Sequence, residues 1–165
     1  MSSPMQETAL AVRQQSLALV ETVRELLEAK GRQIWSVTPE QMVYDAIAIM
    51  ADRGVGALVV LSEGRLAGIV SERDYARKVI LQGKHSKDTQ VREIMTSPVI
   101  TVTPECTVEQ CMEIVTTRRV RHLPVLEGER VAGMISVGDL IKAIISAQAH
   151  TIRQLSCYIT GDYPA

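Results

Sequence analysis

The sequence predicts an α+β, sandwich-like fold in which two tandem, pseudo-symmetric copies of a β-α-β-β-α unit pack sheet to sheet. The first observation is an internal repeat, because residues 37–74 align without a gap on residues 102–139 and 16 of the 38 aligned pairs are identical. The second is that each copy has short apolar runs and a helical apolar pattern in the same order. The third is size, since an isolated unit of about 60 residues would leave one sheet face uncovered.

The first half of each copy is predicted to be a short strand followed by a helix. Residues 34–37 and 99–102 are the apolar runs that predict the strands. Thr38 is expected to be the N-cap of the first helix, with Pro39 at the first helical position and Gln41 three residues after the cap. The spacing i, i+4, i+7 predicts a buried helix stripe at Val43, Ile47 and Met50 and, in the second copy, at Val108, Met112 and Val115.

The second half of each copy is predicted to be a β-hairpin that leads into another helix. A glycine-containing turn separates the two arms, and the second arm runs into a helix that begins at Ser71 or Ser136. Gly54 is expected to end the first helix in a left-handed conformation, whereas Arg119 replaces it in the second copy. The predicted first arms are residues 57–61 and 123–126.

The segments outside the repeat are expected to pack on the two units or to form a dimer contact. The N-terminal segment is predicted to be helical and to stop at Gly31, and its apolar stripe consists of Leu10, Leu17, Val20, Val23 and Leu27. The predicted organisation is an N-terminal helix at 1–31, a first unit at 32–82, a linker at 83–91, a second unit at 92–147 and a C-terminal tail at 148–165.

Composition excludes several classes of function. A net charge of −1 gives no general attraction to nucleic acid or to an anionic membrane, so a bound anion would need a local basic cluster. The three cysteines have no metal-ligand spacing, and a basic start followed by an apolar run, as in a secretory signal, is absent. No apolar stretch approaches the roughly 18–20 residues that span a bilayer. We therefore expect a soluble, cytoplasmic protein.

The repeat resembles the tandem domain pair of the cystathionine β-synthase (CBS) family. The resemblance covers roughly residues 32–147 and rests on "VTP" before the first helix, "RHLPV" at a strand and "G-h-h-S-x-x-D" at a strand–helix junction. "SERDYARKV" and "YITGDYP" are similar to small stand-alone bacterial members. The resemblance implies two clefts that bind adenine nucleotides such as AMP, ADP, ATP, NAD or S-adenosylmethionine. It also implies a homodimer.

The Ser-x-x-Asp motif at each strand–helix junction is the candidate ligand contact. Ser71 and Ser136 start helices, whose free N–H groups favour phosphate, and their hydroxyls can bond phosphate or ribose. Asp74 and Asp139 are carboxylates suited to the paired hydroxyls of a ribose, and the family's matching aspartate contacts ribose. The alternative is a capping box, in which the aspartate accepts the N–H of the cap residue. The two interpretations can coexist.

The copies differ in basic residues, and this difference predicts inequivalent clefts. The resemblance implies that Arg121 and His122 reach the phosphates, because relatives carry a basic pair before "LPV". The Asp139 cleft, with Ser136, is therefore expected to be the stronger site. The Asp74 cleft is expected to bind more weakly, prefer another ligand or use Arg121 from the other repeat. A solvated basic face and a weak nucleic-acid patch are the alternatives for "RRVRH".

Family geometry implies that each cleft's adenine end is lined by the strand entry of the other repeat. For the Asp139 cleft these residues are the region from Gln33 to Trp35, with Val55 and Gly56, and for the Asp74 cleft they are Met95, Pro98 and Ile100. Ala57, which aligns with His122, is also counted among the candidate ligand contacts. Arg73, Arg77 and Lys78 are further candidates for phosphate or for solvent.

The function predicted from these features is a non-catalytic regulatory module that binds an adenine nucleotide and signals occupancy to a partner protein. No nucleophile–base pair, P-loop or metal-ligand run is recognisable, so no catalytic or metal residues are assigned. The alternative is a dimeric scaffold protein whose clefts stay empty. A small enzyme that depends on His122 or a cysteine, and thiol sensing through Cys106 and Cys111, are the remaining hypotheses. Cys106 and Cys111 are five residues apart and therefore do not share a helix face.

Overall fold

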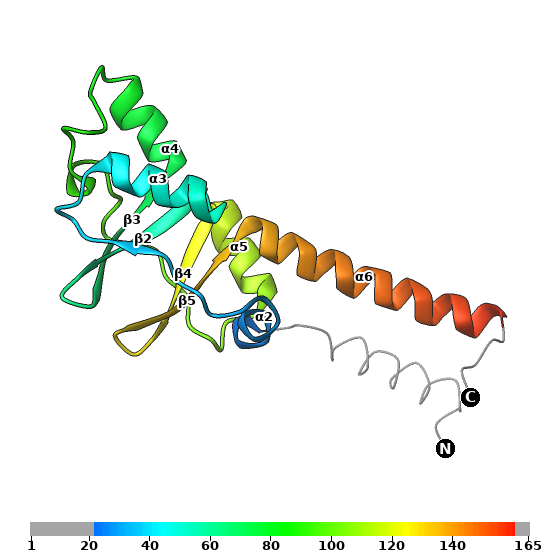
Figure 1. Cartoon of the computed structure of the whole chain (residues 1–165). Helices are drawn as coiled ribbons and strands as arrows, with labels where there is room; N and C mark the ends of the chain where they lie inside the picture. The colour runs from blue at the N-terminus through cyan, green and yellow to red at the C-terminus, as the bar shows by residue number, and fades with distance from the viewer. Residues whose placement is uncertain (1–21, 161–165) are drawn as a thin grey trace.

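The computed structural model describes residues 22–160 and consists of two similar units followed by a long helix (Figure 1). The first unit contains β1 (Ser36–Val37), α3 (Val43–Arg53), β2 (Ala57–Ser62), β3 (Arg65–Ser71), α4 (Glu72–Tyr75) and the π-helical turn η1 (Ala76–Ile80). The second contains α5 (Val108–Arg118), β4 (His122–Glu127), β5 (Arg130–Ser136) and α6 (Val137–Thr160). Helix α2 (Val23–Lys30) precedes the first unit, and the 3-10 turn η2 (Val91–Glu93) precedes the second.

The sheets confirm the predicted pseudo-symmetric α+β repeat. In the first sheet β1 pairs parallel to β2, and β2 pairs antiparallel to β3. The second sheet is the antiparallel pair β4–β5, with register shifts at equivalent places after Val60 and Val125. The two sheets meet where β3 lies against β5. The predicted strand at 99–102 is wrong, because only Val102 forms a bridge, to Val125; the strand predicted at 34–37 is reduced to Ser36–Val37.

The predicted N-cap at Thr38 is wrong, and helix α3 begins five residues later, at Val43. Val43 N–H donates to Thr89 O (2.8 Å) and Tyr44 N–H donates to Ser86 O (3.0 Å), so carbonyl groups from the predicted linker satisfy the helix start. Thr38 instead forms a turn, in which its N–H donates to Gln41 Oε1 (2.8 Å).

In the second copy the N-cap of the first helix also lies further along the chain than the repeat suggested. Thr107 and Gln110 form a capping box at the start of α5. At the other end, Gly54 is left-handed with a φ of 63°, as expected, and Arg119 takes the same conformation with a φ of 52°.

The last helices of the two units differ although their sequences start alike. In the first unit, α4 widens into the π-helical turn η1 and ends at Ile80. In the second, α6 is regular, continues past residue 147 without a break and extends away from the sheets to Thr160 (Figure 1). No helix within residues 22–160 combines the length and hydropathy needed to cross a membrane.

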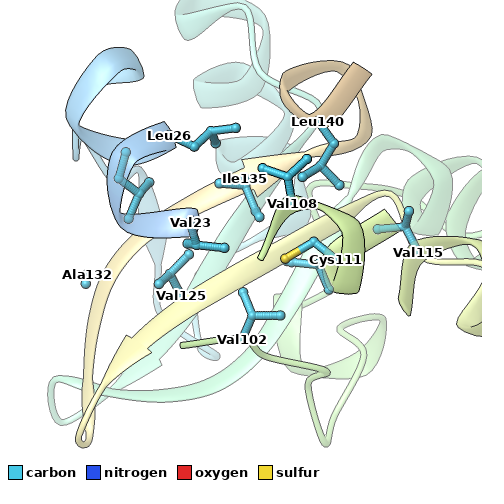
Figure 2. Packing of buried hydrophobic residues seen from close by; sticks show 12 residues of the cluster. Val23, Leu26, Val102, Val108, Cys111, Val115, Val125, Ala132, Ile135 and Leu140 are labelled. Atoms are coloured by element: carbon cyan, nitrogen blue, oxygen red, sulfur yellow. The ribbon is translucent and has the colours of Figure 1, made fainter. Parts of the chain in front are cut away.

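Each unit has its own buried aliphatic cluster, and a short segment from outside the unit completes it. We call residues 22–27 the first strap and residues 90–95 the second strap. Val23 and Leu26 of the first strap lie in the cluster of the second unit, beside Val125 and Ile135 (Figure 2). Val91 and Ile94 of the second strap lie in the cluster of the first unit.

The straps bind their units through equivalent hydrogen bonds. Val23 N–H donates to Cys106 O (2.8 Å) and Arg24 N–H to Pro104 O (2.9 Å). In the first unit Val91 N–H donates to Gln41 O (2.8 Å) and Arg92 N–H to Pro39 O (3.0 Å). The acceptor residues of the two units are 65 residues apart, which is the offset of the repeat. Each strap docks on the unit that does not directly follow it in the chain.

In the N-terminal segment, the described residues differ from the prediction in where the helix begins. Helix α2 begins at Val23 because Thr22 is its N-cap, with an extended backbone and a capping box to Glu25. The helix ends at Gly31 as predicted. Leu10, Leu17 and Val20, and residues 161–165 of the predicted tail, lie outside the described residues.

Candidate functional site

Both Ser-x-x-Asp motifs form capping boxes at the start of a helix. Ser71 N–H donates to Asp74 Oδ2 (3.0 Å), and Asp74 N–H donates to Ser71 Oγ (3.2 Å). Ser136 N–H donates to Asp139 Oδ2 (2.8 Å), and Asp139 N–H donates to Ser136 Oγ (3.2 Å). The capping interpretation therefore holds in both copies, and it occupies amides that were expected to be free for a phosphate.

Each aspartate also has a lysine partner, yet each borders a hollow. Lys78 Nζ lies 2.9 Å from Asp74 Oδ1, and Lys30 Nζ lies 2.6 Å from Asp139 Oδ2. The side chains of Asp74 and Asp139 remain 14% and 18% exposed, and each lines a cleft. Space for a ligand beside the two carboxylates is therefore present in both halves.

The larger hollow, which we call the Asp74 cleft, has a volume of about 620 Å³. Its walls come from α4, η1 and the chain that enters β4, so it lies between the two units. Glu72 and Asp74 are its acidic residues. Its basic residues are Arg73, Arg77, Lys78, Arg119, Arg121 and His122. Cations outnumber carboxylates there, although the whole chain carries a charge of only −1.

The basic cluster of the Asp74 cleft has two sources. Arg73, Arg77 and Lys78 come from the turns that follow Ser71, where the π-helical widening at 76–80 changes the helical register. Arg119 and Arg121 come from the segment that joins α5 to β4. No ion pair within residues 22–160 uses Arg119 or Arg121, so their guanidinium groups are available to an anion.

The smaller hollow, the Asp139 cleft, has a volume of about 390 Å³. Lys30 reaches it from α2 and is fixed there, because its ammonium also donates to Met134 O (2.9 Å). The residues expected at its adenine end, Gln33–Trp35, Val55 and Gly56, all line the hollow, and Ala57 does so as well. Lys30 and Asp139 balance each other, so this cleft has no excess of fixed charge.

His122 and Gly56 are the two residues that line both clefts. A Cβ atom at Gly56 would lie 3.6 Å from the imidazole, so the backbone of one repeat approaches the ring of the other closely. Burial lowers the pKa of His122 below its usual value, and the charges of Lys30 and Arg121 act in the same direction while Asp139 opposes them. The ring is therefore neutral at physiological pH when no anion is bound.

The pKa of Asp139 is set by opposing effects. Burial alone would raise the pKa of this carboxyl, but the hydrogen bond and charge of Lys30, with the Ser136 N–H, hold it below its usual value. Asp139 is therefore a carboxylate that already has strong partners. A ribose at this position would compete with Lys30.

Two parts of the predicted site need correction. Arg121 lies in the Asp74 cleft and not in the Asp139 cleft, which is the arrangement that the sequence had left as an alternative. Met95, Pro98 and Ile100 do not line the Asp74 cleft. Ile69 and Thr96 line the Asp74 cleft in their place. Met95 packs on Gly68, and Ile100 packs against the buried cluster of the second unit.

Sequence reasoning missed Lys30 and did not assign Arg119 as a ligand. Arg119 follows from the aligned pair Gly54/Arg119, which already marked a gain of charge in the second copy. Lys30 lies outside the 38-residue repeat. The strap sequences "TVRELL" and "QVREIM" share Val-Arg-Glu, and extending the repeat to them would have placed α2 on the second unit.

The buried Cys111 is not a reactive thiol. Burial raises the pKa of the Cys111 thiol to about 11, with a further contribution from Cys106, so this thiol stays protonated. Within residues 22–160 no group of His, Cys, Asp and Glu side chains is arranged to bind a metal ion.

Comparison with known proteins agrees with the repeat. The family model for the CBS domain matches residues 22–80 and 91–146. The chain belongs to the CBS domain family. Both matched segments of this CBS pair begin at a strap. A curated relative from Arabidopsis thaliana, named CBS domain-containing protein CBSX3, mitochondrial, is 41% identical over 152 residues, which cover 86% of this chain and 73% of that protein.

Solved structures of CBS proteins share the fold. A protein from Burkholderia ambifaria, described as a putative signal-transduction protein with CBS domains, is 51% identical with a TM-score of 0.74, and the match covers 76% of this chain and 94% of that one. A hexameric CBS-CP12 protein from bloom-forming cyanobacteria is 30% identical with a TM-score of 0.66, and the match covers 73% of this chain and 69% of that one.

Proposed function

We propose that this CBS pair is a non-catalytic regulatory module that binds an adenine nucleotide, such as AMP, ADP, ATP or NAD, and signals its occupancy to a partner protein. The observation that supports the proposal most directly is the basic cluster of the Asp74 cleft. Five arginine and lysine side chains, with His122, surround one hollow in a chain that is slightly acidic overall. Such a cluster attracts a polyanion to this place and not to the surface in general.

The roles of the residues follow from their chemistry. Arg119 and Arg121 have planar guanidinium groups whose N–H donors match phosphate oxygens. Neither has to break an ion pair before it binds a phosphate. Asp74 is placed to accept ribose hydroxyl groups through Oδ1 once Lys78 turns from it to a phosphate. Because its basic residues are more numerous, we assign the phosphorylated ligand to the Asp74 cleft, contrary to the sequence-based expectation.

The Asp139 cleft suits an uncharged part of a ligand better. Its lysine is already bound to Asp139, and its walls are mostly backbone and apolar side chains. One protein of this fold was solved with 5-methylthioadenosine and S-adenosyl-L-methionine, at 22% identity. That similarity is one of fold, so the assignment for this chain rests on the residues of the cleft.

Signalling requires that the nucleotide favours one arrangement of the pair. A ligand present at about 100 times its dissociation constant stabilises the bound form by about 2.7 kcal/mol. A partner protein, or a second copy in a homodimer, responds only if it binds the two arrangements differently. The proposed location is the cytoplasm, as the sequence suggested, and imaging of the tagged full chain tests it against the mitochondrial location in the name of the Arabidopsis relative.

A thermal-shift panel of AMP, ATP, NAD and S-adenosylmethionine tests the ligand proposal. We expect ATP to raise the melting temperature of the full chain, and Arg121→Ala to weaken ATP binding by about tenfold or more, because a charged hydrogen bond contributes about 1.5–3 kcal/mol. Arg130→Ala is the control. It removes the same charge from an exposed arginine at the hairpin turn that lines neither cleft.

A dimeric scaffold with empty clefts is the second candidate function. The capping boxes and the two lysine–aspartate pairs favour it, because they satisfy the groups that a nucleotide would bind. If no adenine compound shifts the melting temperature, the scaffold function replaces the nucleotide function. Equal ATP binding by the Arg121 and Arg130 variants would instead contradict the assignment of the phosphates to Arg121 in the Asp74 cleft.

A further inference from the structure

Helix α6 carries an exposed aliphatic stripe that the clefts do not use. Among residues 22–160 eight large apolar side chains are exposed, and five of them lie on this one helix. The five, between 43% and 82% exposed, are Ile141, Ile145, Ile152, Leu155 and Ile159. A scattered exposed leucine or isoleucine needs no explanation, but five on one helix form a patch that a soluble chain normally covers.

The spacing of the stripe matches lengthwise packing against another helix. Its members are separated by 4, 7, 3 and 4 residues, and Gln148 divides the gap of 7 into 3 and 4. The resulting 4-3-4-3-4 pattern is the a/d pattern of a heptad repeat, which keeps one seam facing a partner helix along its whole length. A compact ligand or a loop would not require this regularity over about 27 Å of helix.

The body of the molecule covers a different face of α6. Leu140 is buried in the second cluster, and Val137, Ala143 and Ile144 pack against the same cluster. Beyond these residues the helix extends away from the sheets (Figure 1), while the exposed stripe continues to Ile159. The stripe is thus continuous from the edge of the folded unit to the far end of the helix.

The charges on α6 indicate what kind of partner fits. From Leu140 to the end of the helix the sequence contains no acidic residue, and Lys142 and Arg153 are its only arginine or lysine residues. No ion pair within residues 22–160 involves this part of α6. A charged partner therefore finds little to complement, whereas a second, equally apolar stripe of the same period complements it fully.

We propose that this stripe pairs with the same stripe of a second copy of the chain, as a two-helix coiled coil between protomers. The proposal names the surface of the homodimer put forward above, and it does not depend on nucleotide binding. Gln148 is then a polar residue at a core position. Such residues lower the stability of a coiled coil while they help to specify its register and number of strands.

Four variants of the full chain test the proposal by sedimentation equilibrium. Ile152→Glu and Leu155→Glu place a charge in the seam, and each is expected to raise the dimer dissociation constant at least 100-fold. Gln148→Leu replaces the polar core residue and is expected to lower the constant about tenfold or more. Cys157→Glu adds the same charge to an exposed residue of the same turns that lies off the stripe, and it is expected to leave the constant unchanged.

Circular dichroism and the ATP thermal shift on the same samples separate this test from the nucleotide test, because a folded variant keeps its cleft. A wild-type chain that remains monomeric at 100 μM overturns the proposal. Equal masses for wild type, Leu155→Glu and Gln148→Leu overturn it as well. A fall in melting temperature without a change in mass would assign the stripe to a segment of the same chain, such as residues 1–21, and would also overturn it.

Discussion

At the scale of single residues, His122 is the titratable side chain that borders both clefts. The ring lies between the Asp74 cleft and the Asp139 cleft, with Lys30, Arg121 and Asp139 as its charged neighbours. Burial and the two cations favour the neutral ring in the folded chain. A phosphate in the Asp74 cleft would act in the opposite direction on the pKa of His122, since an anion stabilises the imidazolium form. One side chain can therefore respond to ligands on both sides.

The lowered pKa of His122 predicts that the folded chain loses stability as the pH falls below neutrality. The unfolded chain takes up the proton near pH 6.5, whereas the folded chain resists it until a lower pH, so the free energy of unfolding decreases through this window. Urea unfolding at intervals from pH 7.5 to 5.0 measures the slope, and His122→Gln should reduce it. His85→Gln, at an exposed histidine in the linker, is the control. Equal slopes for the two variants would contradict the argument.

Residue-scale chemistry was only partly predictable from the sequence. The Ser-x-x-Asp motifs identified where the clefts are, because their spacing from the hairpins is fixed by the repeat. The sequence could not assign Arg121 to a cleft. Adjacent residues at the start of a strand point to opposite sides, so Arg121 and His122 do not serve one site in the same way. Lys30 was unpredictable by this route because its position depends on a tertiary contact of α2.

At the scale of elements, the straps explain why two glycines recur in the hairpins. A Cβ atom at Gly133 would lie 2.7 Å from Leu27 Cδ2, and one at Gly68 would lie 2.7 Å from Met95 Sδ. Each strap therefore inserts a large side chain at the place where its hairpin has none. The hairpins and turns were predictable from local patterns. The start of α3 was not, because its first amides are satisfied by carbonyl groups more than 40 residues away.

Substitution of these glycines is expected to loosen the straps. Gly133→Ala should lower the free energy of unfolding by about 1–3 kcal/mol, the usual cost of overpacking, because Leu27 is fully buried and has little room to move. Gly138→Ala is the matched control, since its new methyl group would meet only Ser136 Oγ at 3.6 Å. That control should be neutral or stabilising by up to about 1 kcal/mol in a helix. Urea unfolding compares the two, and an equally stable Gly133→Ala chain would show that the strap can shift freely.

At the scale of the whole molecule, the straps connect the two CBS units to each other in a reciprocal way. The order along the chain is first strap, first unit, second strap, second unit, and each strap packs on the unit that does not directly follow it. Neither cluster is complete without a segment that belongs covalently to another part of the chain. Ligand binding at the junction of the units can therefore affect both, which is the requirement for a module that reports occupancy.

This arrangement predicts that a substitution that destabilises one unit also destabilises the other. Leu27→Ala removes a fully buried side chain from the cluster of the second unit and should cost about 2–5 kcal/mol. The single tryptophan, Trp35, packs against the cluster of the first unit. If the units unfold together, Trp35 fluorescence and far-UV circular dichroism will move to the same lower urea midpoint. Leu81→Ala, at a side chain that is 79% exposed, should leave both midpoints in place. A fluorescence midpoint that stays at the wild-type value in Leu27→Ala would mean that the two units unfold independently, because only the second has then lost its support.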